Sequence, residues 1–228
     1  EKCNNGDHHW MHRLPYFPNS HTWLYQSGDW FDSDPYSNYK DDNAWYAPDL
    51  IENILKSKVK HEIGCHTFSH IDFSDKYCPP NVAEDEINAC IEAAKPWDIN
   101  LKSIVFPGGT YGNIEVLKKF NFEVYRRNRL EKLVIPYLDE FGLTVTNSTQ
   151  MIGSINSEWS IDYQVWRLKK MISQAIKTNT VAHFWFHPSD YYVKPVFEII
   201  LPMIDSLRNK DKIWVGRMMD LPSLNKFN

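Results

Sequence analysis

From residue 46 onward the chain alternates between amphipathic segments and short apolar runs. Apolar side chains that recur every three or four residues predict helices, whereas short unbroken apolar runs predict buried strands. The helical pattern covers 47–58, 82–94, 113–120, 162–177 and 194–208, and we expect the last helix to bend near Pro202. The strand pattern covers 62–65, 103–106, 122–125, 181–186 and 213–216. This alternation predicts an α/β architecture with a parallel sheet or barrel.

Two segments fall outside this alternation. Residues 1–46 contain 11 aromatic side chains and show neither helical nor strand periodicity, so we interpret 1–45 as an irregular excursion that packs over one end of a single domain spanning 1–228. The polar stretch 146–160 is expected to be a loop rather than a domain linker.

Pro107-Gly108-Gly109 ends the strand at 103–106, because this tripeptide favours a turn.

Composition narrows the function classes. The 228 residues carry 25 Lys and Arg against 29 Asp and Glu, so a basic face for nucleic acid is not expected. The most apolar stretch, 197–204, contains Glu198 and Pro202 and is too short to cross a membrane. We therefore expect a soluble protein, cytoplasmic or exported after removal of a leader. The four cysteines form no C-x-x-C pair and are expected to be free or to form one bridge at most.

The most informative string is HEIGCHTFSH at 61–70. It does not fit the zinc-protease helix H-E-x-x-H, because His66 comes one residue too late after His61 and Glu62. His66 and His70, with three residues between them, are expected to lie on one side of a turn after a strand. Two neutral imidazoles there could bind a divalent metal, completed by a carboxylate and a water; the alternative is that both are ordinary structural histidines.

The same string resembles the second motif of the NodB-homology polysaccharide deacetylases, which runs Glu-Ile-Gly, a small residue and then H-[ST]-x-x-H. Asp72 fits the usual continuation of that motif. The segment 103–113 resembles the third motif, 183–188 the closing motif, and 213–223 the last strand and its following helix. The resemblance covers residues 46–223.

This resemblance implies a distorted, incomplete (β/α) barrel that removes the acetyl group from N-acetylated carbohydrate. In the family a divalent metal, usually zinc, is held by two histidines and one aspartate, and a second aspartate is the base. His66 and His70 would be the metal ligands, and His187 the general acid. The backbone around Gly108 and Gly109 would either donate hydrogen bonds to the oxyanion or form an ordinary turn.

Three further residues are candidates for the substrate pocket. Strand alternation puts His183 and Trp185 on the same face as His187. His183 is expected either to line the same pocket or simply to fill the barrel. Tyr111 and Trp185 are candidates for stacking on a sugar ring, and burial in the core is the alternative for each.

The chain also departs from the family pattern. A first motif, in which an apolar strand ends in T-F-D-D, is not found, although it would carry the base and the aspartate ligand. None of the aspartates before His66 follows an apolar run; they are Asp7, Asp29, Asp32, Asp34, Asp41, Asp42 and Asp49. The third motif lacks an arginine ahead of Pro107. Arg126 or Arg167 could replace it, or each could form a structural salt bridge.

Three explanations of the missing motif stay open. A strand with the aspartates could precede this chain, which opens at Glu1 without a Met. Asp7, His8 or His12, within the segment 6–12, could complete a rearranged site. Otherwise the site is degenerate and the fold is kept to bind carbohydrate. The resemblance therefore implies a metal-dependent hydrolase that removes N-acetyl groups from a glycan, with a carbohydrate-binding protein without turnover as the alternative.

Overall fold

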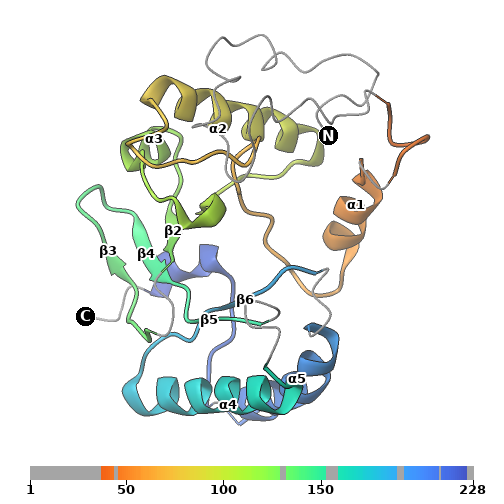
Figure 1. The fold of residues 1–228 in the computed structure, drawn as a ribbon, viewed down its shortest axis with the longest axis vertical. Coiled ribbons are helices and arrows are strands. Elements are labelled where there is room, and N and C mark those ends of the chain that lie inside the picture. The colour runs from red at the N-terminus through yellow and green to blue at the C-terminus, as the bar shows by residue number, and fades with distance from the viewer. Residues whose placement is uncertain are drawn as a thin grey trace. The chain divides into compact units, whose positions relative to one another are not determined.

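The computed structural model describes residues 37–43, 46–128, 132–152, 159–188, 193–210 and 212–224 (Figure 1). The chain divides into two compact units, with unit 1 ending at Phe122 and unit 2 beginning at Glu123. Most of the predicted N-terminal excursion lies outside the described residues. No helix in the described ranges has the length and apolar character needed to cross a membrane.

The described residues of unit 1 form three helices, one strand and two short 3₁₀ turns. They are α1 (Pro48–Lys56), α2 (Pro80–Ala94), η3 (Lys95–Trp97), β1 (Ser103–Val105), η4 (Pro107–Gly109) and α3 (Ile114–Lys119). The three helices predicted for this part of the chain are confirmed. The predicted strand at 62–65 is reduced to a parallel bridge between Cys65 and Ile104. Its two hydrogen bonds run from Cys65 N to Ser103 O (2.8 Å) and from Val105 N to Cys65 O (3.0 Å).

The buried residues of unit 1 include members of α2 and of the segment that follows the histidine string. Ile87 on α2 is fully buried, as are Ile71 and Phe73. Helix α1 behaves differently, because none of its residues is buried and Leu50 is 58% exposed. The apolar stripe of this segment correctly predicted a helix, but the apolar face of the helix is not buried.

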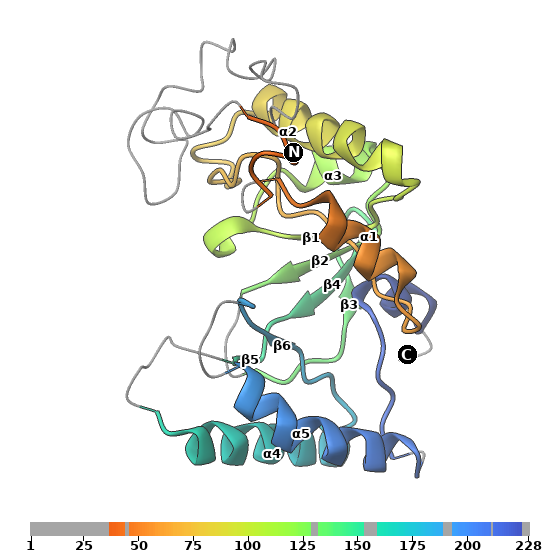
Figure 2. The same cartoon turned by 90° about the vertical axis from the view of Figure 1, so that its right-hand side faces the viewer.

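In the described part of unit 2 there are five strands and two long helices (Figure 2). They are β2 (Val124–Arg127), β3 (Tyr137–Leu138), β4 (Thr144–Asn147), β5 (Gln150–Met151), α4 (Ile161–Thr178), β6 (Phe184–Trp185) and α5 (Val193–Arg208), followed by η6 (Met218–Leu224). Strand β2 pairs in parallel with β4, which pairs antiparallel with β3, while β5 pairs in parallel with β6. The described strands do not close into a barrel, so the prediction of an incomplete α/β architecture is confirmed.

Two sequence predictions for unit 2 are wrong. The stretch 146–160 is not wholly a loop, since β4 extends to Asn147 and β5 covers Gln150–Met151. All four β4 side chains are buried although three of them are polar. The apolar run 213–216 is not a strand, and its Trp214 and Val215 are about half exposed, at 49% and 53%.

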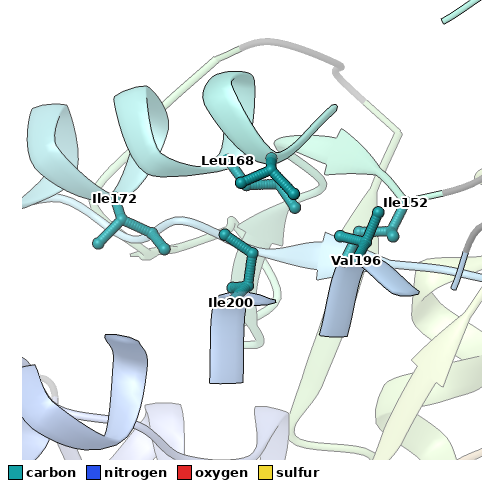
Figure 3. Close-up of a cluster of buried hydrophobic side chains, with 6 residues drawn as sticks. Ile152, Leu168, Ile172, Val196 and Ile200 are labelled. Carbon is teal, nitrogen blue, oxygen red and sulfur yellow. The ribbon is translucent and has the colours of Figure 1, made fainter. Parts of the chain in front are cut away.

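Helices α4 and α5 form the apolar core of unit 2 (Figure 3). The Ser160 hydroxyl caps α4 by accepting a hydrogen bond from Tyr163 N (3.2 Å), and the helix ends at Asn179 in the left-handed region. Helix α5 continues through Pro202 to Arg208. The buried cluster between the helices and β5 comprises Ile152, Val165, Leu168, Ile172, Val196 and Ile200, against which Phe184 of β6 packs. This packing fixes one face of β6, and strand alternation directs His183 and Trp185 to the other.

Candidate functional site

The histidine loop, residues 66–70 of unit 1, brings the two predicted metal ligands together. The ring centroids of His66 and His70 are 5.0 Å apart, with an angle of 73° between the planes. His66 Nδ1 lies 2.6 Å from the carbonyl oxygen of Val105, at the end of β1. An N–H donated from Nδ1 leaves the lone pair on Nε2, which is the tautomer that a metal-binding histidine needs.

The histidine loop is held in an unusual backbone conformation. Thr67 and His70 have positive φ angles of 58° and 59°, and this left-handed region costs a non-glycine residue about 1 kcal/mol or more. The buried carboxylate of Glu86, on α2, stabilises the loop by accepting hydrogen bonds from Phe68 N (2.8 Å) and Ser69 N (2.9 Å). The Ser69 hydroxyl also hydrogen-bonds to this carboxylate.

Glu86 was not among the residues predicted for the site. A signal was available, because Glu86 lies three residues after Ala83 and four before Cys90, on the apolar stripe of its helix. An acid at such a position must be hydrogen-bonded or neutral when the stripe is buried. Burial raises the pKa of Glu86 to about 7, although the hydrogen bonds from Ser69 and Phe68 act in the opposite direction. Glu86 Oε2 accepts both N–H groups and Oε1 accepts the Ser69 hydroxyl, so each of the three donors of the loop has an acceptor on this one side chain.

This raised pKa gives the histidine loop a pH-dependent stability. Because the folded pKa of about 7 exceeds the ordinary value of 4.5, the folded state binds the proton more tightly, and stability falls as pH rises from about 4.5 to 7. The fall is expected to be about 3 kcal/mol. Urea unfolding at pH 5 and pH 8 measures it, with Glu86→Gln as the comparison. The glutamine keeps the contacts but not the titration, so an equal fall in both proteins would disprove the assignment.

The turn after β1 contains both predicted oxyanion glycines. Gly108 and Gly109 have φ angles of 54° and 76°, in the left-handed region that glycine adopts readily. The N–H of Gly109 donates to Phe106 O (3.1 Å) and is therefore engaged within the turn. Tyr111 lies edge-on to Phe106, with ring centroids 6.1 Å apart, and its exposed fraction of 39% shows that it is not a core residue.

A second group of predicted residues lies in unit 2. We call Arg126, His183, Trp185 and His187 the arginine–aromatic cluster. The Arg126 guanidinium lies 5.3 Å from the centre of the Trp185 ring, and Trp185 meets the exposed His187 ring edge-on at 5.6 Å. The three aromatic residues were predicted to share a face. Arg126 was predicted only as a possible replacement for the missing arginine, and its contact with Trp185 was not predicted.

The surroundings of His183 keep its imidazole neutral. Burial, and to a lesser extent the charge of Arg126, lower the pKa of His183 to about 4. The backbone N–H of His183 donates to the Thr149 hydroxyl (3.0 Å), which ties β6 to the start of β5. His183 also lines a largely apolar pocket of about 480 Å³ in unit 2, between the end of α4 and residues 212–218.

Arg167, the other candidate for the missing arginine, has a different environment. Its Nε donates to Gln150 Oε1 (3.2 Å), and its guanidinium lies 4.5 Å from the Trp159 ring centre. The hydrogen bond to Gln150 joins α4 to β5.

The described residues supply two of the ligands that a divalent metal site needs, but not a third. The His66 and His70 pair has the spacing and, for His66, the tautomer that a metal requires. Within the described residues, no group of three or more His, Cys, Asp and Glu side chains could hold a metal. Asp72 is engaged locally, since its Oδ1 accepts hydrogen bonds from the backbone N–H and the hydroxyl of Ser74. The other predicted donors, Asp7, His8 and His12, lie outside the described residues.

Three cysteines are described, and none forms a disulfide. Cys65 and Cys78 are buried, and Cys90 is partly buried. The Cys90 thiol hydrogen-bonds to Cys65, and this contact together with burial raises its pKa. These three free thiols agree with the prediction that the cysteines are free or form one bridge at most. Cys3 lies outside the described residues.

Comparison with known structures identifies the fold. The chain superposes on a probable polysaccharide deacetylase from Pseudomonas aeruginosa PAO1 with a TM-score of 0.62 and 13% identity, over 82% of this chain and 65% of that one. It also resembles 4-alpha-glucanotransferase from Thermococcus litoralis, with a TM-score of 0.54 and 16% identity, over 83% of this chain and 31% of that one. No family model and no curated protein matches the sequence. The chain therefore has a fold like that of the deacetylase, and it spans 65% of the length of that protein.

Proposed function

We propose that this protein is a metal-dependent hydrolase that removes N-acetyl groups from a glycan. The observation that carries the proposal is the pairing of the His66 and His70 rings in one loop. The carbonyl oxygen of Val105 fixes the tautomer of His66, and the Glu86 carboxylate holds the backbone of the loop. The deacetylase-like fold supports it. The same fold with unrelated side chains at these two positions would not suggest this chemistry.

The residues of the chain have separate tasks in this proposal. His66 and His70 would supply two imidazole ligands to a divalent metal, with zinc as the expected ion. Such a metal, when bound, lowers the pKa of a water and polarises the amide carbonyl. The third ligand and the base would come from outside the described residues. His187, on unit 2, is exposed and would give a proton to the leaving amine.

Metal content tests the ligand pair. The purified protein, loaded with zinc, cobalt or nickel and then desalted, is expected to retain about one ion per chain, and the His66→Ala/His70→Ala double variant none. His61→Ala is the matched control, since His61 is exposed and precedes the loop. A double variant that keeps its metal would falsify the proposed site.

Acetate release from N-acetylated oligosaccharides tests the role of His187. His187→Ala is expected to lower the rate by about 100-fold while leaving the metal content unchanged, because general acid catalysis contributes roughly that much. His61→Ala should retain the full rate. An undiminished rate in His187→Ala would remove this residue from the mechanism.

One observation favours carbohydrate binding without turnover as a second candidate. Tyr163 and Trp166 both belong to α4, and their rings stack on each other with centroids 5.6 Å apart. Tyr163 is 40% exposed and Trp166 is 53% exposed. Exposed aromatic rings can stack on sugars. Under this alternative, oligosaccharides bind to the Tyr163 and Trp166 surface, His66→Ala/His70→Ala binds them unchanged, and the metal-loaded protein releases no acetate.

A further inference from the structure

Arg126 is a partly buried cation on β2 of unit 2. It is the third of the four residues of this strand and pairs in register with Thr146 of β4. Its guanidinium lies 5.3 Å from the centre of the Trp185 ring. Burial lowers the pKa of Arg126 to about 10, which still leaves the group charged at neutral pH.

No carboxylate balances this charge in the described part of the chain. Burial alone accounts for the pKa of Arg126, with no contribution from an acidic group. Two other arginines of unit 2 do have acidic partners, Arg208 with Asp205 (2.9 Å) and Arg217 with Asp220 (2.7 Å). The neighbouring His183 is neutral and offers no negative charge. A buried charge without a counter-ion is costly, so the site gains stability when an anion enters it.

The groups around Arg126 are suited to an anion. A guanidinium presents a planar fork of N–H donors that matches a carboxylate or a phosphate with two parallel hydrogen bonds. Trp185 adds a second donor, because its indole Nε1 is buried and makes no hydrogen bond with the described residues. Both side chains therefore have hydrogen-bonding capacity that the described fold does not use.

We propose that Arg126 and Trp185 form a binding site for the carboxylate or phosphate group of a ligand. If the proposed function holds, the ligand is an acidic glycan, and the anion is a uronate carboxylate or a phosphate on the sugar. The proposal rests on the proposed function only in assigning the anion to a sugar. The anion site itself belongs to unit 2 and requires neither metal nor turnover.

Thermal unfolding of the full chain tests the site, with glucuronate, glucose 1-phosphate and neutral glucose as probes at constant ionic strength. A ligand at 100 times its Kd is expected to raise Tm by roughly 5–10 °C. A rise with glucuronate alone identifies a carboxylate site, and a rise with glucose 1-phosphate alone identifies a phosphate site. Glucose should produce no rise. The absence of a saturable rise with either anion would overturn the proposal.

Substitutions assign the effect to Arg126. Arg126→Met should abolish the rise, and Arg126→Lys, which keeps the charge but loses the fork, should weaken binding by about tenfold. Arg208→Met is the matched surface control and should respond like the unsubstituted protein. If the anion raises the Tm of Arg126→Met as much as that of the unsubstituted protein, the assignment is contradicted. If Arg126→Met does not fold, an equal rise in the Tm of Arg126→Lys contradicts it. The rise should persist in His66→Ala/His70→Ala, so failure of the deacetylase proposal and failure of the anion site give different results.

Discussion

Replacing Glu86 with alanine is expected to lower the free energy of unfolding by about 3–5 kcal/mol at pH 5. The substitution removes the acceptor of Phe68 N and Ser69 N and the partner of the Ser69 hydroxyl. Each buried polar group left without a partner costs about 1–3 kcal/mol, and the lost side-chain volume adds to this. Urea unfolding followed by circular dichroism measures the loss. At pH 8 the deficit should shrink, because the unsubstituted protein then bears the cost of ionising Glu86.

Glu84→Ala is the matched control for this prediction. Glu84 lies on the same helix, but it pairs with Lys119 at the surface (2.7 Å) and should contribute less than about 1 kcal/mol. Metal retention at pH 7 provides a second measurement, since Glu86→Ala frees the loop that holds His66 and His70 in position. If Glu86→Ala and Glu84→Ala cost the same, Glu86 does not stabilise the histidine loop.

The local spacing of His66 and His70 was enough to predict that the two rings lie together. The three residues between them limit their separation, and no distant part of the chain has to be known. Glu86 and Arg126 were different. The role of Glu86 depends on contacts 17 and 18 residues back along the chain, and that of Arg126 on a ring 59 residues ahead, so local pattern could not reveal their partners.

The strand predictions failed for a related reason. The Thr-Val-Thr-Asn sequence of β4 has too few apolar residues to be recognised as a buried strand, yet parallel pairing with β2 satisfies its backbone. Ile213–Gly216 has the opposite character. Its apolar residues satisfy the pattern, but the Trp214 ring folds back against Gly216, where a Cβ atom would collide with it. Strand formation depends on a partner as well as on composition.

The second large effect is expected at Gly112, where the turn after β1 meets the segment that follows the histidine loop. A Cβ atom at this position would lie 2.5 Å from Asp75 N and 2.8 Å from both Phe73 O and Ser74 Cα. All three are backbone atoms, and they cannot move aside as a side chain can. The contact is fixed further by hydrogen bonds from Asn113 N to Asp75 Oδ1 (2.7 Å) and from Asn113 Nδ2 to Phe73 O (3.1 Å).

Gly112→Ala is therefore expected to lower the free energy of unfolding by about 3 kcal/mol or more, at the upper end of what overpacking costs. It should also reduce metal retention, because the displaced backbone begins three residues after His70. Gly64→Ala is the matched control. Its Cβ atom would approach the Ser103 hydroxyl (2.5 Å), which can rotate away, and would lie 3.3 Å from the Ser103 carbonyl oxygen, which requires a shift of only a few tenths of an ångström, so a loss of about 1 kcal/mol is expected. Equal losses measured by urea unfolding would mean that the backbone of residues 73–75 can move aside, and that the turn after β1 does not support the histidine loop.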